Sequence, residues 1–154
     1  MGARSVPVVA RGGKFVFAQL IKEVVEFLGL NEDVGPKLSP KELVERADAI
    51  WTAAVRYCGQ MPDTALDKEL PNRPRSYRVL MHHIFQVPTA FLGARRSGGA
   101  LAYEALVSPP PDSLKTSADI AAFGEVLRLD FAAWAASEGP GLGQGRTATY
   151  YGEQ

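Results

Sequence analysis

The first thirty residues combine short apolar runs with glycine. Two β-prone runs, residues 6–10 and 14–17, flank the sequence Arg11-Gly12-Gly13, and this arrangement predicts a β-hairpin with a glycine turn. Apolar residues then recur at helical spacing over residues 20–28, and Gly29 follows at the position where glycine commonly ends a helix. Residues 1–30 are therefore predicted to form a hairpin and one short helix, followed by a polar linker over residues 31–38.

Three longer segments carry apolar residues at the spacing of an amphipathic helix. The first opens with Ser39-Pro40-Lys41-Glu42, which has the form of a capping box with proline at the first helical position, and its apolar positions continue to Cys58. The second covers about residues 76–94, and the third begins near residue 116 or 117 and ends before Gly139-Pro140. The pattern predicts a mainly α-helical chain in which residues 39–154 form an antiparallel, up-down bundle.

The segments between these helices are polar or rich in glycine and proline. Residues 63–73 are predicted to form a long loop, and most of residues 97–117 a connection in which residues 101–107 add a turn of helix. Pro88 lies inside the second helical pattern. It is expected to kink or split that helix, because proline has no backbone N–H to donate.

Charge and composition narrow the classes of function. The 154 residues fit one domain, or one domain with a small appendage, and 17 Lys and Arg balance 17 Asp and Glu. The chain therefore lacks the basic excess that is typical of nucleic-acid-binding proteins. Its apolar runs are too short to span a bilayer, and its lone cysteine, Cys58, excludes an intramolecular disulfide. We expect a soluble, cytoplasmic protein that binds neither nucleic acid nor membranes.

The only two histidines, His82 and His83, are adjacent on the second predicted helix. On a helical wheel the apolar residues centre between Leu80 and Ile84. This places His82 on the opposite side, facing solvent, and His83 at the edge of the apolar face. His83 is therefore predicted to face the bundle interior or its rim, either as a hydrogen-bonded helix residue or as a metal ligand.

Other side chains bear on whether His83 belongs to a metal centre. Such a centre needs several converging ligands, and no further histidine exists in the chain. Asp48 and Asp130 lie near the edges of the apolar faces of the other two long helices, where each is either an additional ligand or a solvated flanking residue. Cys58 ends the apolar face of its helix without a second cysteine nearby, so we predict that it is a small core residue.

The sequence Ser-Tyr-Arg-Val-Leu-Met-His-His-Ile-Phe-Gln-Val-Pro-Thr-Ala-Phe-Leu at residues 76–92 resembles the second helix of the DinB/YfiT-like superfamily. In that family a Leu-Leu-x-His-Ile/Leu pattern carries a metal-binding histidine, and in register this role falls on His83. The resemblance covers about residues 39–154. It implies a four-helix bundle, a divalent metal such as zinc, nickel or iron held by three histidines, and, in some members, isomerase or transferase chemistry with small thiols.

One part of the family pattern is absent. The family's other two histidines form a His-x-x-x-His pair on the last helix, whereas this sequence closes with Tyr150-Tyr151-Gly152-Glu153-Gln154 and contains no such pair. Three helices in that geometry also leave an apolar groove where the fourth would pack. We therefore expect either a homo-oligomer or a missing C-terminal segment, whose helix would carry a His-x-x-x-His pair facing His83.

Residues 5–30 resemble the C-terminal half of a glutaredoxin, which consists of a Val-Pro step, a two-stranded hairpin and a closing helix. In glutaredoxins the proline is cis and the backbone before it pairs with the cysteine of glutathione. The resemblance thus implies a thiol-binding role for Val6 and Pro7, while the cis and trans forms of their peptide bond both stay open. The half that holds the redox cysteine is absent. We expect this half of a thioredoxin-like fold to pair with another chain or to be held against the helices.

Two functions fit these observations. In the first, the protein is a binding or scaffold protein, a DinB-like bundle with a glutaredoxin-like segment in which neither active site is complete. In the second, it is a metal-dependent thiol transferase or isomerase with a divalent metal at His83, completed by another chain or by a missing C-terminal helix, and with glutathione as a candidate thiol. We favour the first function for this chain and the second for its ancestry.

Overall fold

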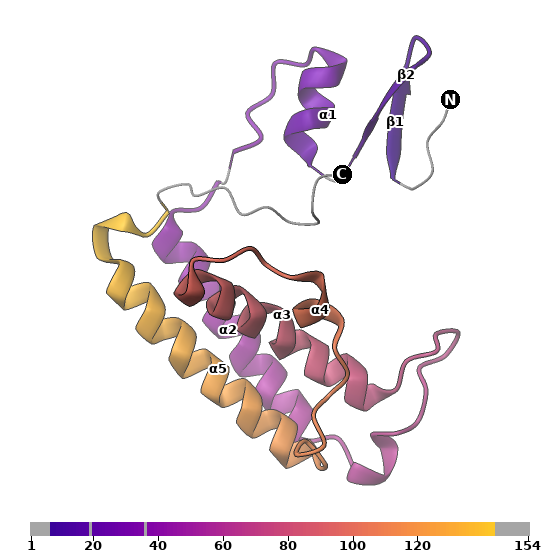
Figure 1. Cartoon of the computed structure of the whole chain (residues 1–154), viewed down its shortest axis with the longest axis vertical. Helices are drawn as coiled ribbons and strands as arrows, with labels where there is room; N and C mark the ends of the chain where they lie inside the picture. Colours follow the sequence, from indigo (N-terminus) through magenta and orange to yellow (C-terminus); the bar gives the residue numbers. More distant parts are fainter. Residues whose placement is uncertain (1–6, 19, 36, 144–154) are drawn as a thin grey trace. The chain divides into compact units, whose positions relative to one another are not determined.

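The computed structural model describes residues 7–18, 20–35 and 37–143 (Figure 1). These residues form five α-helices, two short 3-10 helices and one two-stranded antiparallel sheet, so the predicted mainly α-helical class with a small hairpin is confirmed. The chain divides into two compact units, Met1–Lys37 and Leu38–Gln154. The division falls inside the polar segment of residues 31–38.

The first unit begins with the predicted hairpin. Strand β1 (Val8–Arg11) pairs with β2 (Lys14–Phe17), and Arg11 lies opposite Lys14 across the two-residue turn. Both turn residues, Gly12 and Gly13, have positive φ, at 58° and 79°. A two-residue turn of this kind suits the twist of the flanking strands, and glycine adopts it without a clash at Cβ.

Helix α1 (Ile21–Leu28) packs against β2 and ends at Gly29, as predicted. Gly29 has φ 67°, and its N–H donates to the carbonyl of Glu26 while that of Leu30 donates to Val25, which closes the last turn. None of the described residues of this unit is buried. A two-stranded sheet with one helix is marginal by itself, because it covers too little apolar surface to offset its ordering.

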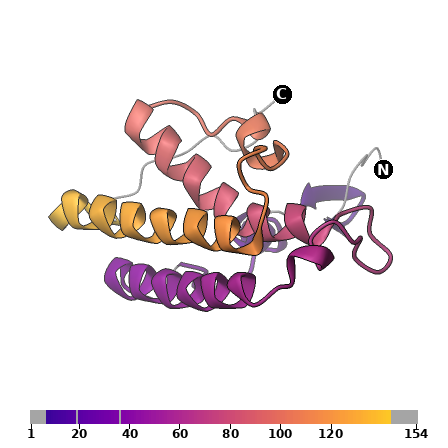
Figure 2. The same cartoon turned by 90° about the horizontal axis from the view of Figure 1, so that it is seen from below.

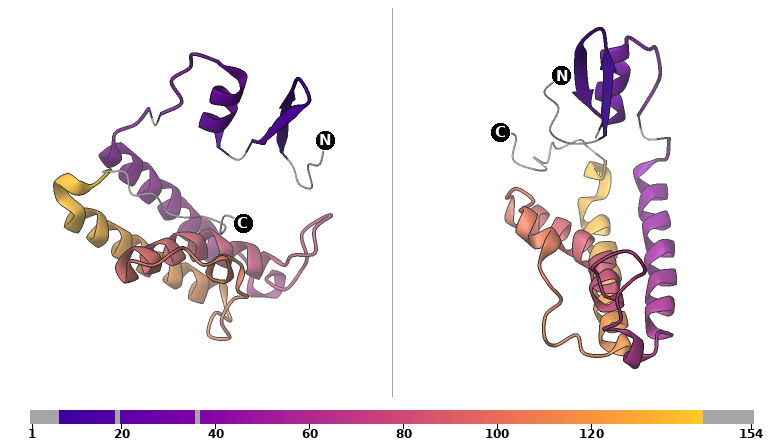
Figure 3. Two further views of the ribbon diagram at one scale, coloured as in Figure 1. Left: turned by 45° about the horizontal axis from the view of Figure 1, so that its top comes forward. Right: turned by 90° about the vertical axis from the view of Figure 1, so that its right-hand side faces the viewer.

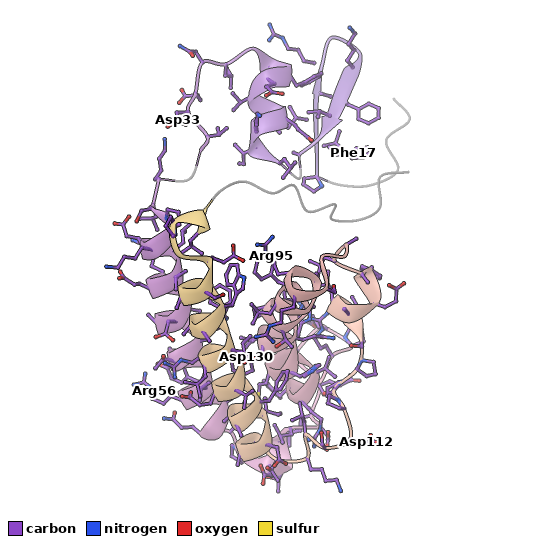
Figure 4. All side chains as sticks on the ribbon, turned by 60° about the vertical axis from the view of Figure 1, so that its left-hand side comes forward. Phe17, Asp33, Arg56, Arg95, Asp112 and Asp130 are labelled. Carbon is purple, nitrogen blue, oxygen red and sulfur yellow. The ribbon has the colours of Figure 1, made fainter. Side chains whose placement is uncertain are left out.

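The second unit contains three long helices: α2 (Pro40–Gly59), α3 (Tyr77–Ser97) and α5 (Ser117–Glu138). A 3-10 turn η1 (Asp63–Ala65) follows α2, the short helix α4 (Tyr103–Val107) lies in the predicted connection, and η2 (Gly139–Gly141) follows α5. Figure 2 and Figure 4 show α5 between the other two long helices. Helix α5 packs extensively against both α2 and α3, whereas α2 and α3 touch little.

The directions of the helices correct the simple up-down expectation. Helices α2 and α5 lie side by side (Figure 3). They are antiparallel, because the ring of Trp51 contacts that of Phe131 edge-on and an added Cβ at Gly59 would lie 3.8 Å from Ala121. Helices α3 and α5 are parallel, because Phe85 lies against Gly124 near their beginnings and Arg95 bonds to Glu138 near their ends. The long connection through α4 makes this possible, since it returns the chain to the beginning of α3 before α5 starts.

Helix beginnings in this unit are held by side-chain caps. Ser39 and Glu42 form the predicted capping box at α2, and Thr116 forms another with Asp119 at α5. The carboxylate of Asp63 in η1 also accepts the N–H of Ser117 at 2.8 Å. This bond fixes the start of α5 against the end of α2 and leaves one fewer helix N–H without a partner.

The core lies where α5 meets its two neighbours. Phe85, Leu66 and Ile120 are its largest fully buried side chains. A cluster of aromatic rings packs against them at the end of α5, with ring centroids 4.8–6.4 Å apart: Trp51, Phe91, Phe131 and Trp134. The four rings are half-buried and cover one another. Large apolar side chains that remain exposed include Val126 and Leu129 on α5 and the aromatic Tyr57 on α2.

Pro88 does not split α3, which continues through it to Ser97. The missing N–H leaves the carbonyl of Ile84 without its usual helical donor. One residue further on, the hydroxyl of Thr89 donates to the carbonyl of Phe85 at 2.8 Å, in addition to the backbone pattern of the helix. The surrounding packing against α5 keeps the helix intact at this point.

Candidate functional site

The two histidines lie in the middle of α3, on a helix whose orientation is set by its neighbours. Ser76 caps the helix by accepting the N–H of Val79 at 3.3 Å, and the buried residues are Met81, His82, Phe85, Gln86 and Leu92. Met81, Phe85 and Leu92 face α5 and the core. The helix is therefore rotated relative to the wheel drawn from the sequence.

His82 is buried, which makes the prediction of a solvent-facing His82 wrong. Only 5% of its surface is exposed, and its ring stacks on Phe123 of α5 at a centroid distance of 5.6 Å. Its Nδ1 atom is buried without a hydrogen-bond partner in the part of the chain that the structure describes. Burial lowers the pKa of His82, and the neighbouring His83 lowers it further. The ring is thus held as neutral imidazole.

The physical reason for the reversal lies in the packing of the helix. The aliphatic residues Ile84 and Val87 belong to the apolar arc used for the wheel, yet both are exposed. A second arc with Phe85 and Met81 faces α5 instead, and His82 lies on that arc. Because α5 sits on one side of α3 and α2 barely reaches it, only one of the two apolar arcs is covered.

His83 is half-buried and belongs to a chain of polar side chains. Its Nδ1 lies 3.3 Å from the side-chain oxygen of Gln86, whose amide nitrogen donates to the carbonyl of Ser108 at 2.8 Å and to its hydroxyl at 2.7 Å. Since this orientation of the amide presents its oxygen to the ring, Nδ1 of neutral His83 carries the proton. The Nε2 lone pair is then left available as an acceptor or as a metal ligand.

The hydrogen bond between His83 and Gln86 was not predicted from the sequence. Histidines that bind metals usually donate their other ring N–H to an oxygen atom, which fixes the tautomer and the ring orientation. Gln86 provides such an oxygen and is itself anchored by Ser108, next to the end of α4. The signal available in the sequence was the spacing of His83 and Gln86, three residues apart on one helix face.

Among the described residues, His83 is a single candidate metal ligand and not part of a group of ligands. Within residues 7–18, 20–35 and 37–143, no three His, Cys, Asp or Glu side chains lie close enough together to hold a metal ion. The two carboxylates considered with His83 are engaged in ion pairs, Asp48 with Arg128 at 3.0 Å and Asp130 with Arg96 at 3.1 Å. A metal at His83 would therefore need ligands from elsewhere.

The other candidate residues lie apart from the histidines. Cys58 is buried at the end of α2, and burial raises the pKa of its thiol, so it has the character of a core residue. Pro7 is exposed beside the hairpin, and its carbonyl accepts the N–H of Ala18 at 2.9 Å. Val6 lies outside the described residues, so the proposed thiol-binding pair is seen at Pro7 alone.

An apolar surface, rather than a polar centre, distinguishes the outside of the helical unit. On α5, five exposed apolar residues recur at intervals of four and three residues: Ala122, Val126, Leu129, Ala133 and Ala136. We call these five residues the outer face of α5. Val126 and Leu129 are 61% and 64% exposed, and the opposite side of α5 carries the core residues Ile120 and Leu127. A helix that is apolar on both sides is typical of one covered on both sides.

Exposed apolar side chains also occur on α2 and α3. Leu43, Ile50 and Tyr57 recur every seven residues along α2, and Arg56 lies over the ring of Tyr57 at 5.0 Å. Figure 4 shows Arg56 pointing outward from α2.

Among the described residues, no helix combines the length and the apolar character needed to cross a membrane.

Comparison of the chain with models of known protein families, with curated proteins and with solved structures gives no match in any of the three.

Proposed function

We propose that this protein is a helical binding module, which acts by docking the outer face of α5 against another protein surface. The observation that carries the proposal is the exposure of Val126 and Leu129 on a helix whose other side already fills the core. An exposed, contiguous apolar face of this kind marks interaction sites in soluble proteins.

The finer identity of the two units belongs to the same proposal. We infer a DinB-like bundle in residues 39–154, and half of a thioredoxin-like fold in residues 1–30, with a cytoplasmic location. Three long helices, the position of His83 on the second of them and the hairpin followed by a helix support this interpretation. Because the first unit has no buried residue among those described, a partner surface would also stabilise it.

Site-specific photo-crosslinking in cells tests the binding module. We replace Leu129 by the photoreactive amino acid p-benzoylphenylalanine in the full chain and compare it with the same replacement at Ile50, which is equally exposed at 64% on another helix. The expected result is one discrete adduct from position 129, lost when Val126→Glu is added. Absence of an adduct at position 129, or the same adduct from position 50, would contradict the proposal.

A second candidate function is metal-dependent chemistry at His83, favoured by the hydrogen bond that its Nδ1 donates to the side-chain oxygen of Gln86. That bond leaves the Nε2 atom of His83 free as a ligand for Zn²⁺, Ni²⁺ or Fe²⁺. Such a metal, when bound, would act as a Lewis acid that polarises a substrate or activates a small thiol such as glutathione. The chain's own contribution would be to hold His83 in one tautomer through Gln86 and Ser108, while a second chain or a C-terminal continuation would supply further ligands.

Titration with Zn²⁺ alone separates this candidate from the first. Binding to the full chain is expected to disappear in His83→Ala and to weaken about 10- to 100-fold in Gln86→Leu, since second-layer partners tune affinity to that degree. His82→Phe is the matched control, because His82 is buried against Phe123 and has no role in the site. Equal binding by His83→Ala and the unmodified chain, or no binding by either, would remove the metal function.

A further inference from the structure

The outer face of α5 is electrically neutral along its whole length. The helix carries five charged residues, and each is engaged within its own unit: Asp119 in the capping box, Glu125 with Arg128, Arg128 also with Asp48, Asp130 with Arg96, and Glu138 with Arg95. None of them belongs to the outer face. The partner of this face therefore has no charge to match, and an apolar helix face is the surface that complements it.

The order of large and small residues on the outer face suits a copy of itself. The midpoint of α5 (Ser117–Glu138) lies between Leu127 and Arg128. Two copies placed antiparallel about that point bring Val126 of one opposite Leu129 of the other, twice. On either side of these pairs the same register brings Ala122 opposite Ala133, where small side chains let the helices approach closely, and beyond them Ala136 opposite the capping residue Asp119. Antiparallel helices also align their dipoles favourably.

We propose that the protein forms a symmetric homodimer in which the outer faces of two α5 helices pack antiparallel. The proposal rests on the proposed function and names its partner as a second copy of this chain. Each copy presents the same patch, as a two-fold interface requires. The intervals of four and three residues along the patch are those of the contact line between two packed helices.

The size of the contact sets the strength of the dimer. A helix of 22 residues is about 33 Å long, and a single pair of helices covers less than the roughly 800 Å² per partner of a standard interface. We therefore expect a reversible dimer that dissociates in the micromolar range, rather than a permanent one.

Sedimentation equilibrium of the full chain tests the association. Concentrations from about 1 to about 200 µM cover the expected micromolar dissociation constant. We expect a monomer–dimer equilibrium that Leu129→Glu weakens at least tenfold. Ile50→Glu is the control, since Ile50 has the same exposed fraction of 64% on α2 and should leave the equilibrium unchanged. A monomer over the whole range overturns the homodimer, as does a dimer that Leu129→Glu leaves intact.

The register is tested by disulfide formation between two variants, Ala122→Cys and Ala133→Cys. Mild oxidation of their mixture should link one variant to the other, whereas each variant alone should stay unlinked, because its two cysteines lie about 16 Å apart in the antiparallel register. Links within each variant alone, without mixed links, overturn the antiparallel arrangement. If photo-crosslinking at position 129 yields an adduct with a different protein only, the homodimer is wrong while the binding module stands.

Discussion

The ring of Phe85 on α3 occupies the space that a side chain at position 124 of α5 would need, and the residue at that position is glycine. A Cβ atom at position 124 would lie 2.6 Å from two carbons of that ring, and Phe85 is completely buried. The ring cannot move aside, since it is packed on every side. The close approach of α3 and α5 therefore depends on a residue without a side chain.

Gly124→Ala is expected to destabilise the protein by about 1–3 kcal/mol, because overpacking outweighs the better helix propensity of alanine. Gly93→Ala in α3 is the control, since an added Cβ there has no neighbour within 4 Å. That control should be stabilised by up to about 1 kcal/mol. Urea unfolding of the two variants provides the comparison, and equal stability of both would show that the helices are less closely packed at Phe85.

His82 should make stability depend on pH near neutrality. Its pKa in the folded protein is lowered from 6.5, mainly by burial and further by the neighbouring His83. Below about pH 6.5, His82 binds a proton in the unfolded chain but stays neutral in the folded one. The free energy of unfolding therefore falls as the pH drops towards 5.

The pH prediction is checked by unfolding measurements between pH 5 and 7.5. His82→Phe should remove the slope in this interval, because phenylalanine keeps the ring against Phe123 and cannot titrate. His83→Phe should keep the slope, because burial of His82 is its main cause. A slope that His82→Phe leaves unchanged would mean that another group is responsible.

Arg78 ties two loops to the start of α3. It bonds to both carboxylate oxygens of Asp67, at 2.8 and 3.1 Å, and one of its terminal nitrogens donates to the carbonyls of Leu114 and Lys115. This bond to Arg78 is also the main cause that lowers the pKa of Asp67. A lysine cannot reproduce the planar fork of donors that these four oxygens require.

Arg78→Lys is accordingly expected to cost about 1–3 kcal/mol, nearly as much as Arg78→Ala, since the carbonyls lose their donors in both variants. Arg75→Lys, at an exposed position three residues earlier, should be neutral within about 0.5 kcal/mol. Thermal unfolding monitored by circular dichroism measures the difference. If the lysine variant is as stable as the parent, the stabilisation by Arg78 comes from its positive charge alone and not from its planar set of donors.

Local signals in the sequence predicted the elements well. The turn at Gly12 and Gly13, the end of α1 at Gly29 and the capping box at Ser39 each depend on a few neighbouring residues, and each is present in the structure. The predicted turn of helix at residues 101–107 is also confirmed, as α4. Such features follow from backbone conformation and short-range hydrogen bonds, which a local pattern encodes directly.

The arrangement around the histidines could not be read in the same way. Helix α3 has two apolar arcs, one with Ile84 and Val87 and one with Met81 and Phe85, and the sequence does not say which arc a neighbouring helix covers. That choice depends on Gly124, which lets α5 approach at Phe85 and so buries His82. The bond from Gln86 to Ser108 likewise joins segments 22 residues apart, beyond any local pattern.

The antiparallel pairing of α2 with α5 has a kinetic consequence. Helical proteins of this size often refold in microseconds to milliseconds, because their contacts are mostly local. Here Asp48 meets Arg128, a partner 80 residues later in the chain, and Trp51 meets Phe131 at a similar separation. The closing of that long loop must precede the main helix contact, so refolding should be slower than the helical content alone suggests.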